Sequence, residues 1–123
     1  GDLKEFELAD VKILSEKVPL QKGTVNNGGS NVYQLSVQNG AKVVVVAENT
    51  NNNNKEFFEF GVIDNGTDIF HTEYGNVRTG EQLIVPTFEK TASGFARVNF
   101  DIGSSVTAGH NVVVTIVSNI NKK

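Results

Sequence analysis

Three Asn-Gly dipeptides, at Asn27-Gly28, Asn39-Gly40 and Asn65-Gly66, constrain the fold of this chain more than any other feature. Asn and Gly tolerate the positive φ angles of a type I′ turn, and the twist of that turn suits two paired antiparallel strands. The second and third dipeptides are set between runs that alternate apolar and polar residues. We therefore predict a chain of β-hairpins.

The turn at Asn39-Gly40 is predicted to join a strand ending at Gln38 to a strand running from Lys42 to Ala47. A two-residue loop fixes the register of such a hairpin. The predicted cross-strand pairs are Leu35 with Val44 and Tyr33 with Val46 on one face, and Ser36 with Val43 and Gln34 with Val45 on the other. The returning strand is apolar on both faces.

The third dipeptide is predicted to join Glu56–Asp64 to Thr67–Tyr74. In this hairpin one face carries Phe58, Phe60, Val62, Ile69 and His71, and the opposite face carries Phe57, Ile63, Phe70 and Tyr74. A three-residue loop would shift the pairing by one residue and place Phe60 beside Phe70, so the faces depend on the turn type. Both faces are apolar enough to require cover.

The chain as a whole is predicted to be a single all-β domain, residues 1–123. About eight short strands, with turn signals every 8 to 12 residues or so, are typical of an antiparallel β-sandwich, immunoglobulin-like or jelly-roll-like, rather than a small barrel. Residues 1–10 are expected to be a flexible arm, a short helical turn or an edge strand, and residues 121–123 a tail. Pro19 and Pro86 favour edge positions because proline has no N–H for a ladder hydrogen bond.

The clearest alternation lies in Ala96–Ile102, which follows a turn at Ser93-Gly94. Its even-numbered residues are apolar and are predicted to face the core, whereas Arg97, Asn99 and Asp101 face water. By contrast, Glu48–Lys55 consists of polar residues, five of them asparagines, and is predicted to be a solvated hairpin tip.

Composition excludes several classes of function. The chain has no Cys, so it has no disulfide, no thiol nucleophile and no thiolate metal site. A net charge of −3 with interspersed signs argues against a nucleic-acid partner. The longest strongly apolar run, Val43–Ala47, is far shorter than the roughly 20 residues needed to cross a bilayer, so no membrane span is expected.

No constellation of residues indicates catalysis, and we predict a protein that is not an enzyme and holds no metal or cofactor. His71 and Glu73 lie two apart on one strand, but an acid–base pair needs further partners that the sequence does not supply. His110 stands in a loop without an evident partner. Asp64, Asn65 and Asp68 crowd one turn, where Asx side chains usually bond their own backbone rather than Ca²⁺.

Two strands carry more apolar residues than a lone sandwich can bury. Val43 and Val45 on one strand, and Val113 and Val117 on another, are predicted to form an exposed patch that contacts another subunit. The alternative is that the amino-terminal segment, with Leu3, Phe6 and Leu8, folds across them.

Several blocks of the sequence resemble a β-rich module in virion structural proteins of contractile-tailed marine (cyanobacterial) bacteriophages. These blocks are Ala41-Lys42, Thr50-Asn51-Asn52, Glu59, Val62, Asp64–Asp68, Thr72–Val77, Thr79-Gly80, Ala96-Arg97-Val98 and Val112–Val117. The match spans roughly residues 41–120. The chain departs from the module at Ile63, where a His is usual, and in its longer asparagine loop.

The resemblance implies a virion component with no catalytic residues, whose partners are other virion proteins or copies of itself, as a homo-oligomer. The alternative is that the chain is a secreted, extracellular sandwich that binds a ligand such as a glycan through its loops.

Overall fold

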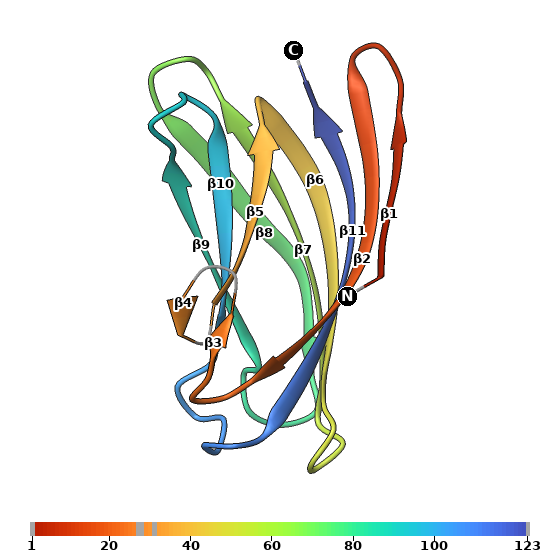
Figure 1. The fold of residues 1–123 in the computed structure, drawn as a ribbon, viewed down its shortest axis with the longest axis vertical. Helices are drawn as coiled ribbons and strands as arrows, with labels where there is room; N and C mark the ends of the chain where they lie inside the picture. Colours follow the sequence, from red (N-terminus) through yellow and green to blue (C-terminus); the bar gives the residue numbers. More distant parts are fainter. Residues whose placement is uncertain (1, 27–28, 31, 123) are drawn as a thin grey trace.

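The computed structural model describes residues 2–26, 29–30 and 32–122, and these residues form an antiparallel β-sandwich, as predicted (Figure 1). The large sheet has the strand order β1 (Asp2–Glu7), β2 (Val11–Gln21), β11 (Asn111–Asn121), β6 (Gly40–Asn49), β7 (Lys55–Asp64) and β8 (Ile69–Arg78). The small sheet has the order β5 (Val32–Gln38), β10 (Ala96–Ile102) and β9 (Ile84–Lys90). A two-stranded ribbon is formed by β3 (Val25–Asn26) and β4 (Gly29–Ser30). The Asn27-Gly28 turn lies outside the described residues.

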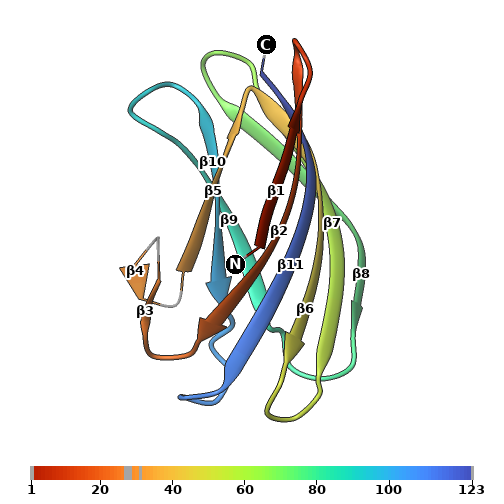
Figure 2. The same cartoon turned by 45° about the vertical axis from the view of Figure 1, so that its right-hand side comes forward.

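The small sheet covers one face of the large sheet, and the core lies between them (Figure 2). Alternate residues of each central strand supply this core, as the period of two in a β-strand requires. The largest fully buried side chains are Phe58, Phe60, Phe100, Leu83, Ile84, Ile116 and Ile120. At the far edge of the large sheet, β1 lies beyond the cover of the small sheet (Figure 1), and its described side chains are exposed.

The prediction of a hairpin at Asn39-Gly40 is wrong. Strand β5 pairs with β10 in the small sheet, whereas β6 pairs with β11 and β7 in the large sheet, so the chain crosses between sheets at this turn. A Cβ on Gly40, whose φ is 154°, would lie 2.8 Å from the carbonyl oxygen of Val62. Glycine therefore serves here to bring the corner close to β7, and not to close a two-residue loop.

The β7–β8 hairpin forms as predicted in its faces, although its loop is longer. Four residues, 65–68, connect the strands, and Asn65 Oδ1 accepts hydrogen bonds from the backbone N–H groups of Thr67 and Asp68, both at 2.9 Å. Ile63 lies opposite Phe70, and Val62 lies opposite His71. Phe58, Phe60 and Val62 consequently face the core, and Phe57, Ile63, Phe70 and Tyr74 share the other side.

Strand β10 also matches its prediction: Ala96, Val98, Phe100 and Ile102 are buried, and the residues between them are partly exposed on the other side. Pro86 lies on β9, an edge strand of the small sheet. Pro19 lies on β2 beyond Lys17, where the pairing with β1 ends and β2 becomes the local edge.

The two ends of the chain are more ordered than a frayed arm and a tail. Of the three alternatives for the first ten residues, the edge strand is the one found, as β1. Asn121 belongs to β11, and Lys122 donates its backbone N–H to Asp10 and pairs with Glu7 at 3.8 Å.

A buried hydroxyl in this core yields a first prediction. Ser118 is 1% exposed on the inner side of β11, between Leu14 and Val43, and its Oγ has no hydrogen-bond partner in the described part of the chain. Because an unsatisfied buried hydroxyl is costly, Ser118→Ala is expected to raise the free energy of unfolding by about 1 kcal/mol, measured by urea denaturation. Ser36→Ala, at an exposed position on β5, is the control and should change it by less than about 0.5 kcal/mol. A destabilised Ser118→Ala would mean that the hydroxyl is satisfied in solution.

Candidate functional site

The side of the large sheet turned away from the small sheet, called here the outer face, carries an unusual number of exposed apolar side chains. Those on β6, β7, β8 and β11, together with the half-buried Val44, form what we call the apolar face: Val44, Val46, Phe57, Ile63, Phe70, Tyr74, Val77 and Val117. A smaller apolar pair, Phe6 and Ile13, lies on β1 and β2 of the same side.

The strand register sets most of the apolar face in two adjacent rows, and a row of Asn119, Lys42, Gly61 and Thr72 separates these from Ile63 and Phe70. Val46 and Val77 lie on either side of Phe57, as its direct cross-strand neighbours on β6 and β8. In the next row Val117 lies opposite Val44, and near the end of the strands Ile63 lies opposite Phe70. Val77 is 63% exposed, Ile63 59% and Phe70 52%. Contiguous exposed apolar surface of this kind marks interaction sites, whereas isolated apolar residues do not.

The outer side of the small sheet has the opposite character. Arg97 pairs with Glu89 at 2.6 Å, and Asn99 donates to the same carboxylate at 3.0 Å. These two hydrogen bonds, first from Asn99 and then from Arg97, lower the pKa of Glu89. The remaining positions of this side include Gln34, Ser36 and Thr87. The sandwich is therefore polar on one outer side and apolar on the other.

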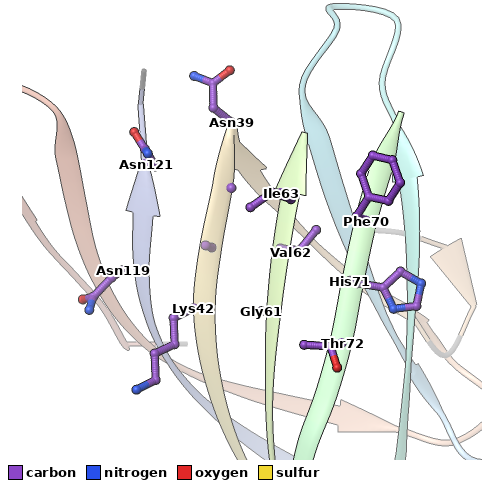
Figure 3. Close-up of a pocket in the computed structure, with 12 residues that line it drawn as sticks. Asn39, Lys42, Gly61, Val62, Ile63, Phe70, His71, Thr72, Asn119 and Asn121 are labelled. Carbon is purple, nitrogen blue, oxygen red and sulfur yellow. The ribbon is translucent and has the colours of Figure 1, made fainter. Parts of the chain in front are cut away.

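A hollow of about 590 Å³ lies within the outer face, over β11, β6, β7 and β8 (Figure 3). Its floor includes Gly61, where an added Cβ would meet nothing within 4 Å. Ile63 and Phe70 line one part of it, and Lys42 and Asn119 line another. The absence of a side chain at Gly61 thus creates a depression beside the most exposed apolar residues.

Two of the four residues predicted to contact another subunit do not lie on the outer face. Val43 and Val45 are completely buried in the core, so their prediction as exposed residues is wrong, and Val44 and Val46 occupy the outer face of β6 instead. Val117 is 45% exposed and Val113 is half-buried, both on the outer face. The amino-terminal segment does not cover these residues, because β1 extends the sheet at its edge.

The two histidines have structural surroundings. The ring of His71 stacks on Phe88 of the small sheet, with centroids 4.0 Å apart and planes 13° from parallel. His71 and Glu73 make no ion pair within the described ranges. His110, which had no evident partner in the sequence, has its Nδ1 3.1 Å from Asn49 Nδ2.

The asparagine-rich segment is a hairpin tip, but it is more ordered than the sequence indicates. Asn49 is fully buried, and the amides of Asn49, Asn52 and Asn54 all donate to the carboxylate of Glu81. These bonds, that of Asn52 foremost, lower the pKa of Glu81. The loop is therefore fixed to the connection between the two sheets and is a structural element.

The oxygen-rich turn at Asp64 is likewise used within the fold. Both carboxylate oxygens of Asp64 lie within 2.7 Å of Lys90 Nζ on β9, and Oδ1 also accepts from Gly66 N at 2.7 Å. The bond from Lys90, and then that from Gly66, lower the pKa of Asp64. No group of three metal-ligating side chains gathers anywhere in the described residues.

At the other edge of the sandwich, the Tyr33 hydroxyl donates to Glu16, and burial raises the pKa of Tyr33. The described residues also contain no helix of the length and apolarity that crossing a membrane requires.

Comparison with known proteins finds similarity in the fold only. No protein-family model and no curated protein matches the chain. The tailspike protein of Acinetobacter phage vB_ApiP_P1 is 15% identical with a TM-score of 0.48, over 87% of this chain and 21% of the tailspike. The tailspike gp49 of Acinetobacter baumannii bacteriophage Fri1, a capsular polysaccharide depolymerase, is 14% identical with a TM-score of 0.49, over 98% of this chain and 20% of that protein. The tailspike of Acinetobacter baumannii phage AM24 is 12% identical with a TM-score of 0.47, over 92% of this chain and 26% of its own. The chain thus spans about a fifth to a quarter of these proteins.

Proposed function

We propose that this chain is a non-enzymatic structural module of a phage virion, and that it acts by protein–protein contact through the apolar face. The observation that carries this proposal is the contrast between the two outer sides of the sandwich, one apolar and one polar. A sandwich that only had to stay soluble would place polar residues on both sides. Covering the apolar face with a partner would remove its exposed apolar area from water, which stabilises the contact by about 25 cal/mol per Å² before the costs of association.

The blocks that carry the sequence resemblance support the same surface. Lys42, Glu59 and the segment Thr72–Val77 belong to β6, β7 and β8, the strands on which most of the apolar face lies. Tyr74 and Val77 of this segment are themselves members of the apolar face. A place in a contractile-tailed marine phage is part of this proposal.

The proposal predicts that the protein co-sediments with particles of the virus that encodes it, and that a charged apolar face abolishes this. Val46→Lys with Val77→Lys introduces two ammonium groups on either side of Phe57, at positions exposed enough to spare the fold. Binding is expected to fall at least about 100-fold, since the pair must be desolvated at an apolar contact.

The matched control is Ser36→Lys with Thr87→Lys, which adds the same charge to the polar side of the sandwich. The control should bind as the unmodified chain does, and both variants should keep its circular dichroism spectrum. Undiminished co-sedimentation of Val46→Lys/Val77→Lys would refute contact through the apolar face.

A second candidate function is the binding of a glycan in the hollow. The observation in its favour is that the hollow combines the exposed ring of Phe70 with the amide side chains of Asn39, Asn119 and Asn121. Rings stack on the apolar side of a sugar and amides bond its hydroxyl groups. Under this alternative, purified bacterial polysaccharides would give saturation-transfer signals with the chain, and Gly61→Val, which fills the hollow, would remove them.

A further inference from the structure

Two charged residues on β6 and β7, the central strands of the apolar face, make no ion pair with another described residue. Glu48 and Lys55 pair with each other at 3.4 Å, but neither Lys42 nor Glu59 has a partner of opposite charge in the described residues. Lys42 is exposed and Glu59 is half-buried. Charges that lie within an apolar surface and are unused by their own chain are available to a partner that presents the opposite charges.

The register places Lys42 and Glu59 at the two ends of one diagonal. Lys42 lies directly opposite Gly61, and Val44 lies directly opposite Glu59, so the four residues form a block across β6 and β7. Consider a two-fold axis that lies in the plane of contact and crosses the line from Lys42 to Glu59 at its midpoint and at a right angle. This axis exchanges the positions of the two residues. A second copy related by that axis would set its Glu59 over Lys42 and its Lys42 over Glu59.

We propose that the partner of the apolar face is a second copy of this chain, bound face to face about such a two-fold axis. This inference rests on the proposed function and names its partner. The contact is isologous, so one self-complementary surface serves both copies and the assembly closes at two. Each dimer then contains two symmetric ion pairs, each between Lys42 of one copy and Glu59 of the other, surrounded by the apolar face.

Other surfaces of the molecule are less suited to bind a second copy. The free edge of β1 carries Lys4, Glu5 and Glu7 in a six-residue strand, and charged side chains on a short edge strand discourage edge-to-edge pairing. On the polar outer side of the small sheet, Arg97 is already paired with Glu89 of its own chain. The apolar face is therefore the surface that gains most from a copy of itself.

The test is sedimentation equilibrium of the full chain and of three charge variants. The unmodified protein is expected to be a dimer. Lys42→Glu and Glu59→Lys should each weaken dimerisation at least about tenfold, because either change turns both symmetric ion pairs of the dimer into pairs of like charge. The double variant Lys42→Glu/Glu59→Lys restores opposite charges and should dimerise within about threefold of the unmodified chain. Ser36→Glu, on the polar side, is the control and should have no effect.

The outcomes separate this inference from the proposed function. A strict monomer at high concentration, combined with particle binding that Val46→Lys/Val77→Lys abolishes, would overturn the second copy as partner and leave the contact function standing. A dimer that neither charge reversal weakens would also overturn the inference, since it would form through another surface. A monomer that binds no particles at all would refute both proposals.

Discussion

Phe60→Ala is expected to lower the free energy of unfolding by about 4 kcal/mol, the largest loss for a single core substitution in this chain. Phe60 is completely buried between the two sheets. Its ring meets Phe88 edge-on, with centroids 5.2 Å apart, and lies 6.2 Å from the rings of both Phe58 and Phe100. Truncation would remove all three aromatic contacts and leave a cavity that the paired strands on either side cannot close.

The matched control lies three residues away on the same strand. Phe57 belongs to the apolar face and is 36% exposed, so Phe57→Ala should cost no more than about 1 kcal/mol in the isolated monomer. Urea denaturation followed by far-ultraviolet circular dichroism measures both. Equal losses in the two variants would contradict the assignment of inner and outer sides on β7.

The two sides of β7 could be predicted from the sequence, although the predicted length of the β7–β8 loop is wrong. Side chains alternate between the two faces of a strand with a period of two, and this alternation on β7 does not depend on the loop. The predicted loop has two residues and the observed loop has four, which moves the cross-strand partners of residues 59–64 by two positions, and a bulge between Phe58 and Glu59 moves those of residues 56–58 by one more. A shift of two leaves every side chain on its original face, whereas a shift of one would reverse them all. The sequence therefore correctly predicts that Phe60 and Val62 share the inner face of β7, but it predicts the wrong residue opposite Phe60.

The turn at Asn39-Gly40 could not be read correctly from local sequence. An Asn-Gly pair between alternating strands predicts a hairpin, but here the two strands find better partners far away in the chain. Strand β5 pairs with β10, and β6 pairs with β11, so the turn becomes a corner between sheets. Such pairings depend on which strands share a sheet, and that information is spread over the whole chain.

The sequence predicts that the chain has an exposed apolar surface, but it identifies only some of the residues that form it. The surplus of apolar residues correctly indicated exposed apolar surface, and Val117 lies in it. On β6, however, residues 43–46 are all valine, so the strand contains no alternation from which to choose its inner side. The neighbouring strands decide this choice, and they bury Val43 and Val45. Nothing in the sequence indicated the hollow, because it depends on Gly61 lying between Lys42 and Thr72.

Arg78→Met is expected to lower the free energy of unfolding by about 3 kcal/mol, although Arg78 itself is near the surface. Its partner Glu56 has a fully buried side chain on the inner side of β7. Glu56 accepts one hydrogen bond from Arg78 Nε and another, of 2.9 Å, from the backbone N–H of Ile84 at the start of β9. The carboxylate thus joins the two sheets, and without Arg78 it would be a buried charge with no compensating cation.

A double variant separates the buried charge from the loss of packing. Glu56→Leu/Arg78→Met removes both charges, so it should regain about half of the loss and leave only the unpaired N–H of Ile84, at about 1 to 2 kcal/mol. Thermal and urea denaturation of the single and double variants give the comparison. Arg78→Met could instead lower the free energy of unfolding by less than about 1 kcal/mol, as the loss of an exposed ion pair would. Water would then reach Glu56 in solution, and its carboxylate would not be a buried contact between the two sheets. If the double variant is less stable than the single one, the N–H of Ile84 and the packing around it contribute more than the ion pair does.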